Sequence, residues 1–332
     1  MREDRYHRQR LLKEWSQEKV RGSTVFIAGV GALGSVVALN LVMMGVGEIL
    51  IADYDTVEVS NLNRQLLFKE DDVGRNKAEA ARDALLEVNP DVKVEAFPVD
   101  IAEVPREHYE KCDVIVDGLD TFEARRWINS LAVELKKPLV HGGMYGWWGN
   151  VQVVIPYVTP CLECQPLIPE DRLMQICTPL GVKRKKRERV KVREALPAVV
   201  TVSCVIGGIQ SQEVVKILLG LKPLDSFLFY DGLNQAFTLV PLRRNPKCVV
   251  CGEEYALKGV EYALDPEETV GELKGRLSAT WGLREPVRLV YKARLIEGDD
   301  KKIKELNVKS GDVLFVYDQS RAKPVKITVK IS

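Results

Sequence analysis

The sequence of 332 residues lacks several features that would place it in a broad class at once. No apolar run reaches about 18 residues and the charged N-terminus has no apolar core, so neither a membrane span nor a signal peptide is predicted. The formal net charge is only +1, which gives no overall attraction to nucleic acid or to an anionic membrane. Internal repeats and low-complexity linkers are also missing. We therefore expect a cytoplasmic globular protein with no nucleic-acid or membrane partner.

Short apolar segments alternate with helical segments along the first part of the chain. Residues 24–30 predict a strand, 31–45 a buried helix and 48–53 a second strand, which together form a βαβ unit. Further strands are predicted at 93–99, 113–117, 148–156 and 226–240, and further helices at 76–87, 122–135 and 196–221. This alternation is typical of an α/β, Rossmann-like, doubly wound, mostly parallel sheet that binds ligands at the C-terminal ends of its strands.

A second, smaller domain is predicted after residue 252, which gives domains 1–252 and 253–332. Thr269 and Glu272 match a capping box that opens a helix to about Trp281, and about four strands surround that helix. This pattern predicts a small α+β domain of the β-grasp type. Within the first domain, residues 165–196 form a long charged segment with little periodicity, and such loops are usually functional or mobile.

A glycine-rich turn lies between the first strand and the first helix. In Gly29-x-Gly31-x-x-Gly34 the missing side chains let the backbone approach phosphates at a helix N-terminus. Asp53 ends the next strand, where its carboxylate suits ribose hydroxyl groups. Both features suit NAD as well as ATP, so the turn by itself leaves the nucleotide open.

Polar strings after the second and fourth strands separate these alternatives. They are Asp53–Gln65, which contains SNLNRQ, then DVGRNK at 72–77 and Asp117-Gly-Leu-Asp120. With them, the segment from about Arg5 to Cys251 resembles the ubiquitin-activating enzymes and the related adenylyltransferases of molybdopterin and thiamin biosynthesis. The resemblance implies an ATP site that contains the glycine turn, Asp53 for the ribose, Asn61, Arg64 and Lys77 for the phosphates, Asp55 and Gln65 beside them, and Asp120 for Mg²⁺.

The chemistry of such a reaction agrees with these residue types. When a carboxylate attacks the α-phosphorus of ATP, two anions approach each other and pyrophosphate leaves, so catalysis is mainly positioning and charge neutralisation. Lys77 and Arg64 supply fixed cations for this purpose. Arg8 lies in Tyr6-His-Arg-Gln, which resembles the family motif whose arginine reaches the ATP of the other protomer, and this implies a homodimer.

Two Cys-x-x-Cys pairs suggest a structural metal site. Four thiolates at this spacing suit a tetrahedral Zn²⁺ with no open position, and the resemblance supports this assignment. Redox chemistry and a site without metal remain alternatives. The four cysteines are Cys161, Cys164, Cys248 and Cys251.

Cys177 lies in the long segment, outside both pairs. It resembles the family's Cys-Thr motif, which implies a thiol that takes the modifier from AMP to form a thioester. The basic run 183–193 would favour the thiolate if it folded over Cys177, although it also suits a solvated loop or a clamp for an acidic protein. No separate catalytic-cysteine domain is inserted, so the thioester step is less firmly implied than adenylation.

Residues 253–332 resemble the ubiquitin-fold domain that recruits a ubiquitin-conjugating enzyme in eukaryotic activating enzymes. A fused modifier is a weaker interpretation because the chain ends in Lys330-Ile-Ser332 rather than Gly-Gly. The leading hypothesis is therefore an activating enzyme that uses ATP, Mg²⁺ and a structural Zn²⁺. It would adenylate a ubiquitin-like protein ending in Gly-Gly, form a thioester on Cys177 and pass the modifier to a conjugating enzyme. The alternatives are an adenylyltransferase for a sulfur-carrier protein, a non-catalytic adaptor that binds ubiquitin-like proteins, and a nicotinamide oxidoreductase.

Overall fold

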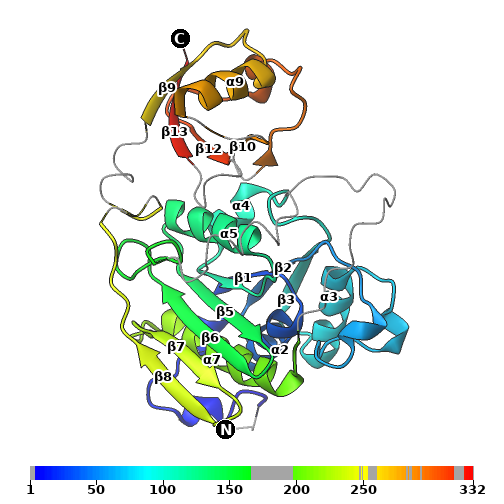
Figure 1. Ribbon diagram of the computed structural model, residues 1–332. Coiled ribbons are helices and arrows are strands. Elements are labelled where there is room, and N and C mark those ends of the chain that lie inside the picture. The colour runs from blue at the N-terminus through cyan, green and yellow to red at the C-terminus, as the bar shows by residue number, and fades with distance from the viewer. Residues whose placement is uncertain are drawn as a thin grey trace.

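The structure is a computed structural model of the chain. It describes residues 4–165, 197–246, 248, 250–252, 260–281, 283, 286–291, 294–317 and 325–331. These residues contain an eight-stranded sheet, with strand order β3-β2-β1-β4-β5-β6-β7-β8, and a separate five-stranded sheet. Figure 1 shows the smaller sheet and its helix stacked beyond helices α4 and α5 of the larger unit.

The larger sheet has a parallel half and an antiparallel half. Strands β1 to β5 run parallel, and β5 to β8 then follow one another as antiparallel neighbours. The strand bounds are β1 Thr24–Ala28, β2 Glu48–Ala52, β3 Lys93–Phe97, β4 Val114–Asp117, β5 Leu139–Tyr145, β6 Trp148–Val154, β7 Phe227–Asp231 and β8 Ala236–Val240. The mostly parallel α/β sheet predicted from the sequence is therefore confirmed.

Helices cover both faces because successive side chains of β1 point to opposite sides. Val25 and Ile27 join one core with helices α2, α3 and α7, whereas Phe26 and Ala28 join a second core with α4 and α5. The helix bounds are α1 Gln17–Arg21, α2 Ala32–Met44, α3 Lys77–Val88, α4 Arg106–Lys111, α5 Phe122–Glu134 and α7 Val200–Leu219, with short 3₁₀ turns η1 Gln9–Leu11, η2 Val59–Asn61 and η3 Glu70–Asp72. By length and composition α7 could cross a membrane, but it packs against α2 and β5 as a core helix.

Helices α1 and α4 were not predicted, and two elements near the glycine turn and β4 also differ from the sequence-based prediction. Strand β5 was not predicted, because its two central glycines weaken the apolar pattern. A Cβ at Gly142 would lie 2.4 Å from Gln210, and a Cβ at Gly143 would lie 2.4 Å from Asn150, so both positions exclude side chains. Helix α7 was predicted from residue 196 but begins at Val200, since Pro197 instead accepts a hydrogen bond from the Gly146 N–H group.

The smaller sheet carries one helix and has mixed strand directions, as expected for a small α+β domain. Its strand order is β11-β10-β12-β13-β9, with β9 and β13 parallel and the other neighbours antiparallel. The predicted capping box is present, since the Thr269 N–H donates to Glu272 and the Glu272 N–H donates to the Thr269 hydroxyl. The bounds are β9 Val260–Leu264, α9 Val270–Trp281, β10 Arg288–Tyr291, β11 Arg294–Leu295, η4 Ile303–Leu306, β12 Val313–Tyr317 and β13 Val325–Ile331.

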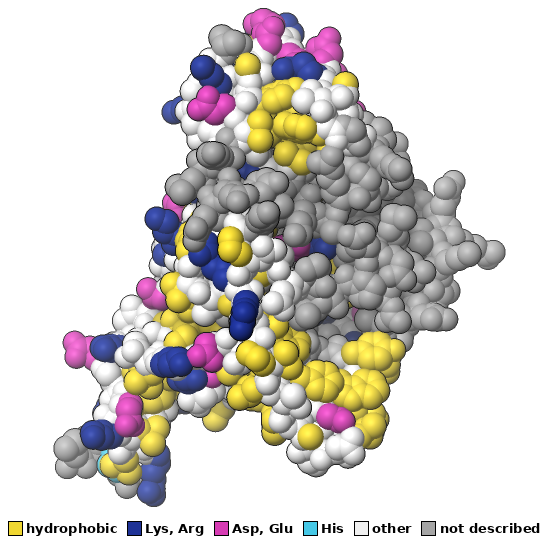
Figure 2. Space-filling model, turned by 60° about the vertical axis from the view of Figure 1, so that its left-hand side comes forward, with side chains coloured by type: hydrophobic (Ala, Val, Ile, Leu, Met, Phe, Trp, Pro, Cys, Tyr) yellow, Lys and Arg dark blue, Asp and Glu magenta, His cyan; other side chains and the backbone are white. Residues whose placement is uncertain are grey.

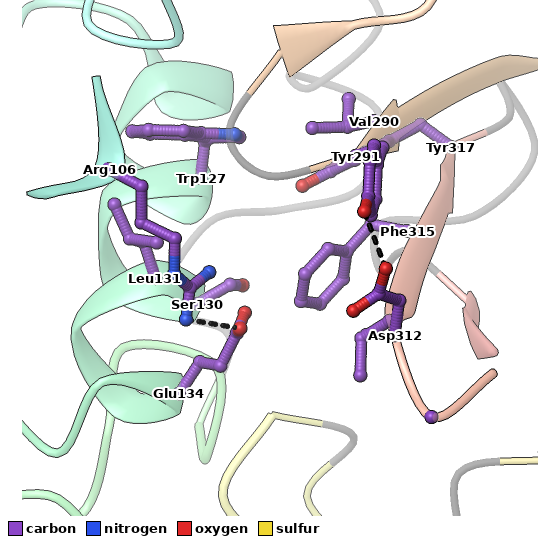
Figure 3. Close-up of a pocket in the computed structure, with 12 residues that line it drawn as sticks. Arg106, Trp127, Ser130, Leu131, Glu134, Val290, Tyr291, Asp312, Phe315 and Tyr317 are labelled. Atoms are coloured by element: carbon purple, nitrogen blue, oxygen red, sulfur yellow. Dashed lines mark hydrogen bonds and ion pairs between the residues drawn. The ribbon is translucent and has the colours of Figure 1, made fainter. Parts of the chain in front are cut away.

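The small domain rests on α5 of the large domain. Val290 belongs to the same buried cluster as Trp127 and Leu131 of α5, and Phe315 and Tyr317 pack against that cluster. A cavity of about 220 Å³ lies along this contact, with the ion pair between Arg106 and Glu134 on one side and the Tyr291–Asp312 hydrogen bond on the other (Figure 3). Residues of the nucleotide motifs do not line it.

Candidate functional site

The glycine turn follows β1 and opens α2. Gly29 has φ of 83°, in the left-handed region that favours glycine. A Cβ at Gly34 would lie 2.0 Å from the Gly29 carbonyl oxygen, so only glycine allows α2 to start this close to the turn. Gly31 precedes the helix and caps it without a side chain. The first N–H groups of α2 are thus free of a side-chain cap, at the positive end of a helix dipole where an anion is stabilised.

Asp53 stands at the end of β2 and faces this turn. Its carboxylate accepts hydrogen bonds from the N–H groups of Val30 and Asp55, each at 2.9 Å. The Asn76 side chain donates to the Asp53 carbonyl oxygen at 3.0 Å, while its own oxygen caps the start of α3. Asp53 is therefore fixed between the glycine turn and α3, where its remaining lone pairs suit ribose hydroxyl groups.

Lys77 is the first residue of α3 and is only 7% exposed. Its ammonium nitrogen lies 3.1 Å from a carboxylate oxygen of Asp55, and its N–H donates to the Asp55 carbonyl oxygen. A buried cation needs a partner, and Asp55 supplies one. The structure thus brings Lys77, Asp53 and Asp55 together at the C-terminal end of the parallel strands, as the sequence predicted.

The turn at 58–65 carries the next group of predicted residues. Asn61 is buried and accepts a hydrogen bond from the Glu58 N–H group, which fixes the turn. Arg64 donates to the Ser60 carbonyl oxygen at 2.7 Å and to the Asn63 side-chain oxygen at 3.1 Å. Gln65 is 5% exposed and lies beside Gly31, and its side-chain oxygen has no hydrogen-bond partner within the described residues. Such an unsatisfied buried oxygen beside the glycine turn is consistent with a ligand site.

The loop after β4 lies directly on the glycine turn. A Cβ at Gly118 would lie 2.7 Å from the Gly29 carbonyl oxygen. Asp120, two residues later, is exposed and contributes with Asp55 to the negative field that, together with burial, raises the pKa of Tyr54 to about 12. In the described residues Asp120 belongs to no ready group of three metal ligands. One carboxylate is enough where nucleotide phosphates supply further ligands to Mg²⁺, so the residues fit that ion.

Burial has a clear effect on the acid at the centre of the site. It raises the pKa of Asp53 to about 6, although Lys77 and the two backbone N–H groups oppose this shift. Burial therefore destabilises the ionised Asp53 carboxylate, and a ligand that donates hydrogen bonds to it would offset this loss of solvation. Perturbed acids of this kind are common at functional sites.

Arg8 is the predicted residue that the structure does not bring into this pocket. Its neighbour Gln9 donates to the Met44 carbonyl oxygen, at the C-terminal end of α2. The glycine turn is at the other end of that 13-residue helix, about 20 Å away at 1.5 Å per residue. Within one chain, Arg8 therefore cannot act on a ligand held by Gly29–Gly34. Cys177 and the basic run 183–193 lie outside the described residues.

The two Cys-x-x-Cys pairs meet in one buried cluster. The four sulfur atoms lie within 4.8 Å of one another, and three pairs of them are 3.2 to 3.9 Å apart. A tetrahedral zinc with bonds of about 2.3 Å would place its sulfurs about 3.8 Å apart, so the cluster fits that ion. Shared hydrogen bonds among the four thiols lower the pKa of Cys248 and Cys251 and raise the pKa of Cys161 and Cys164. Glu163, between the first two cysteines, forms an ion pair with Arg126 of α5 at 2.8 Å.

The sequence analysis missed two buried polar residues that contact Asp117, at the end of β4. His141 of β5 contacts the Asp117 carboxylate, and Gln210 of α7 donates to the Asp117 carbonyl oxygen. Both lie in otherwise apolar segments. A polar residue in such a segment was the feature of the sequence that could have indicated them. A histidine or glutamine in a buried run needs a polar partner.

The comparisons with known proteins agree with this geometry. The family model described as "ThiF family" matches residues 5–250. The chain belongs to this family. A sulfur carrier protein adenylyltransferase of Thermus thermophilus is 39% identical over 263 residues, which covers 76% of this chain and 91% of the relative. The SAMP-activating enzyme E1 of Haloferax volcanii is 37% identical and covers 75% and 89%.

A third relative extends into the small domain. The NEDD8-activating enzyme E1 catalytic subunit of Caenorhabditis elegans is 24% identical over 397 aligned positions, covering 95% of this chain and 91% of the relative. Among solved structures, E. coli MccB crystallised with ATP has a TM-score of 0.61 and 26% identity, and 75% of each chain is covered. The ThiF-family protein described here is therefore an E1-like adenylyltransferase by family, with the Rossmann-like adenylation fold.

Proposed function

We propose that this ThiF-family protein uses ATP and Mg²⁺ to adenylate the C-terminal carboxylate of a small ubiquitin-like or sulfur-carrier protein. The observation that carries the proposal is the convergence of Asp53, Lys77 and the glycine turn at one edge of the sheet, with Asp120 on the adjoining loop. A hydride-transfer enzyme would leave the Asn61–Lys77 region unexplained.

The geometry suits nucleophilic attack at the α-phosphorus. A carboxylate oxygen of the carrier forms a bond to phosphorus, the bond to the bridging oxygen breaks, and pyrophosphate leaves. Lys77 and Arg64 would reduce the repulsion between the two anions, and Asp53 would orient the ribose. Mg²⁺, held by Asp120 with the phosphates, would neutralise charge on the leaving group. Gly29–Gly34 would allow the phosphates to approach the backbone.

An exposed apolar surface beside the site suits a protein substrate. Figure 2 shows hydrophobic side chains gathered over the antiparallel end of the large sheet. Tyr145 and Trp148 stack with parallel rings 6.5 Å apart although both are substantially exposed. Surface aromatic groups of this size are typical of binding surfaces. Others on the same strands and turns are Trp147, Phe229, Leu233, Phe237 and Leu239. We propose that the carrier protein docks here.

A homodimer would explain the position of Arg8. Leu11 and Leu12 of the N-terminal segment and Met43 at the end of α2 are each more than half exposed. Gln9 joins these two elements, so the three side chains belong to one region. We propose that this region meets a second copy of the chain and that Arg8 enters the partner's nucleotide site. The cytoplasm remains the proposed location.

The fate of the acyl-adenylate has two candidate answers. The most similar relatives named above act on a sulfur carrier or on SAMP, which favours the carrier as substrate and its thiocarboxylate as product. The small domain and the alignment with the NEDD8-activating subunit favour a thioester on Cys177 and a conjugating enzyme bound to residues 260–331. Adenylation is common to both answers and is therefore the core of the proposal.

Exchange of labelled pyrophosphate into ATP tests adenylation directly. We expect exchange only when a small carrier protein ending in Gly-Gly is present, and Asp120→Ala should abolish it. Normal exchange by Asp120→Ala would contradict the metal assignment. Absence of ATP binding in calorimetry would instead support a non-catalytic adaptor.

A second experiment distinguishes the two fates. If a thioester forms, the wild-type protein gives a covalent adduct with the carrier that thiols cleave, and Cys177→Ala gives none while it still exchanges pyrophosphate. Thiocarboxylate on the carrier, detected by mass spectrometry after addition of a sulfur donor, would support the sulfur-carrier answer.

A further inference from the structure

A buried hydrogen bond joins two neighbouring strands beside the candidate nucleotide site. Asp117, the last residue of β4, is fully buried, and its carboxylate oxygen lies 2.7 Å from the ring nitrogen Nδ1 of His141 on β5. The two residues are register partners, and His141 is 8% exposed. Since a carboxylate only accepts, Nδ1 carries the hydrogen of this bond. Burying such a pair costs desolvation energy that an apolar pair would avoid.

The second oxygen of Asp117 holds the loop that follows. It accepts a hydrogen bond from the Leu119 N–H group at 3.0 Å. The Leu119 carbonyl oxygen accepts two further hydrogen bonds from Arg125, at 2.9 and 2.6 Å. Thr121 then caps α5 through the Ala124 N–H group. These hydrogen bonds fix the backbone on both sides of Asp120. The first of them along the chain is the one that Asp117 accepts from Leu119.

The same segment is held from two other sides. The Gln210 side chain donates to the Asp117 carbonyl oxygen at 3.1 Å and to the Val140 carbonyl oxygen at 3.3 Å. Gly118 leaves no space for a side chain against Gly29, as shown above. These contacts restrict the loop after β4. The hydrogen bond between Asp117 and His141 then fixes the orientation of the Asp117 carboxylate, and with it the position of the oxygen that accepts from the Leu119 N–H group.

We propose that His141 is a positioning residue for the metal–nucleotide site. By orienting the Asp117 carboxylate, it sets the loop 118–120 and aims the Asp120 carboxylate at a divalent cation bound with the phosphates. This inference rests on the proposed function, because Asp120 is assigned to the metal there. Groups that orient a metal ligand without touching the metal typically contribute about 10-fold to 100-fold in metal affinity.

Two substitutions at His141 separate positioning from packing. In His141→Asn the amide nitrogen takes the place of Nδ1 and keeps the hydrogen bond, whereas His141→Leu keeps most of the volume and loses the donor. Electron paramagnetic resonance measures the binding of Mn²⁺ in the presence of a non-hydrolysable ATP analogue, independently of any carrier protein. We expect His141→Leu to weaken Mn²⁺ binding about 10-fold or more and His141→Asn to restore it to within about threefold.

The control is His108→Leu, which removes a histidine whose ring contacts the Phe97 ring at a tilted angle, outside the Asp117–His141 network. It should leave Mn²⁺ affinity unchanged. In pyrophosphate exchange with the carrier, His141→Leu should need a higher Mg²⁺ concentration than the wild type, and His141→Asn should not. The affinity for ATP without metal should change little in either variant. If His141→Leu is insoluble, Asp117→Leu, which has a similar side-chain size and accepts neither hydrogen bond, should give the same loss of Mn²⁺ affinity.

Unchanged Mn²⁺ affinity in His141→Leu or in Asp117→Leu would overturn the proposal. Equal losses in His141→Leu and His141→Asn would also overturn it, because they would indicate a packing effect. If no carrier supports exchange by the wild-type protein, the proposed function fails while the Mn²⁺ measurement still decides the role of His141.

Discussion

The nucleotide site and the four-cysteine cluster are built in opposite ways. The nucleotide site uses exposed or half-buried loops after parallel strands, and it holds Lys77 and Arg64 with nearby acceptors that a ligand can replace or share. The cysteine cluster is closed, with all four side chains buried and joined to the core beneath α5. The first arrangement suits a ligand that enters and leaves, and the second suits an ion that stays. Substitutions should therefore affect activity and stability separately.

Cys248→Ser should have the largest effect, and on stability. It removes one of four ligands from a buried cluster, and the lost metal binding is worth on the order of 5 kcal/mol or more. We expect the zinc content to fall and the unfolding temperature to drop by about 10–20 °C. Atomic absorption measures the zinc content, and calorimetry measures the unfolding temperature. Cys204→Ser, at an exposed cysteine of α7, should change neither quantity. A full zinc content in Cys248→Ser would contradict the assignment.

Lys77→Met should give the reverse pattern. The substitution keeps the aliphatic part of a buried side chain and removes the cation that we propose to contact the phosphates. The rate of pyrophosphate exchange should fall about 10²-fold to 10³-fold. Zinc content should remain that of the wild type. Lys69→Met, at an exposed lysine of the same region, serves as the matched control and should keep the full rate. Equal rates in the two variants would remove Lys77 from the mechanism.

The binding of ATP should depend on pH through Asp53. Its pKa is raised to about 6, and the ionised carboxylate is the form that accepts hydrogen bonds from ribose. As the pH falls below 6 the protonated form accumulates, so the dissociation constant for ATP should rise, by about fivefold between pH 6 and pH 5. Titration calorimetry between pH 6 and pH 5 measures this dissociation constant. Asp53→Asn should bind ATP weakly with no step near pH 6, and a step that persists in this variant would belong to another group.

Asn76→Ala should have the smallest effect and should connect stability with binding. Asn76 caps α3 and also donates to the Asp53 carbonyl oxygen. Loss of a cap costs about 1 kcal/mol, which denaturant unfolding can resolve. Because the same side chain supports Asp53, a modest loss of ATP affinity should accompany it. Asn76→Asp keeps the cap and should recover most of the stability. Full stability in Asn76→Ala would show that the cap contributes little.

Much of the fold followed from local patterns. The apolar β-branched run at 24–30, the apolar helix after Gly31 and the capping box at Thr269 each specify an element within one short window, and the structure contains all three. The strand Leu139–Tyr145 was missed because its glycines and His141 are required by contacts with distant residues. The start of α7 was misplaced because Pro197 pairs with Gly146, 51 positions earlier.

The sequence by itself determined the chemistry available at the nucleotide site and the cysteine cluster. Gly29–Gly34, Asp53 and Lys77 lie close in the chain or follow adjacent strands, so spacing was enough to group them. Only the tertiary structure decided that Asp117, His141 and Gln210 form one buried network, and that Arg8 lies about 20 Å from the turn it was expected to serve. The physical reason is that buried polar partners are chosen by packing across strands and helices, which leaves no periodic trace in the sequence.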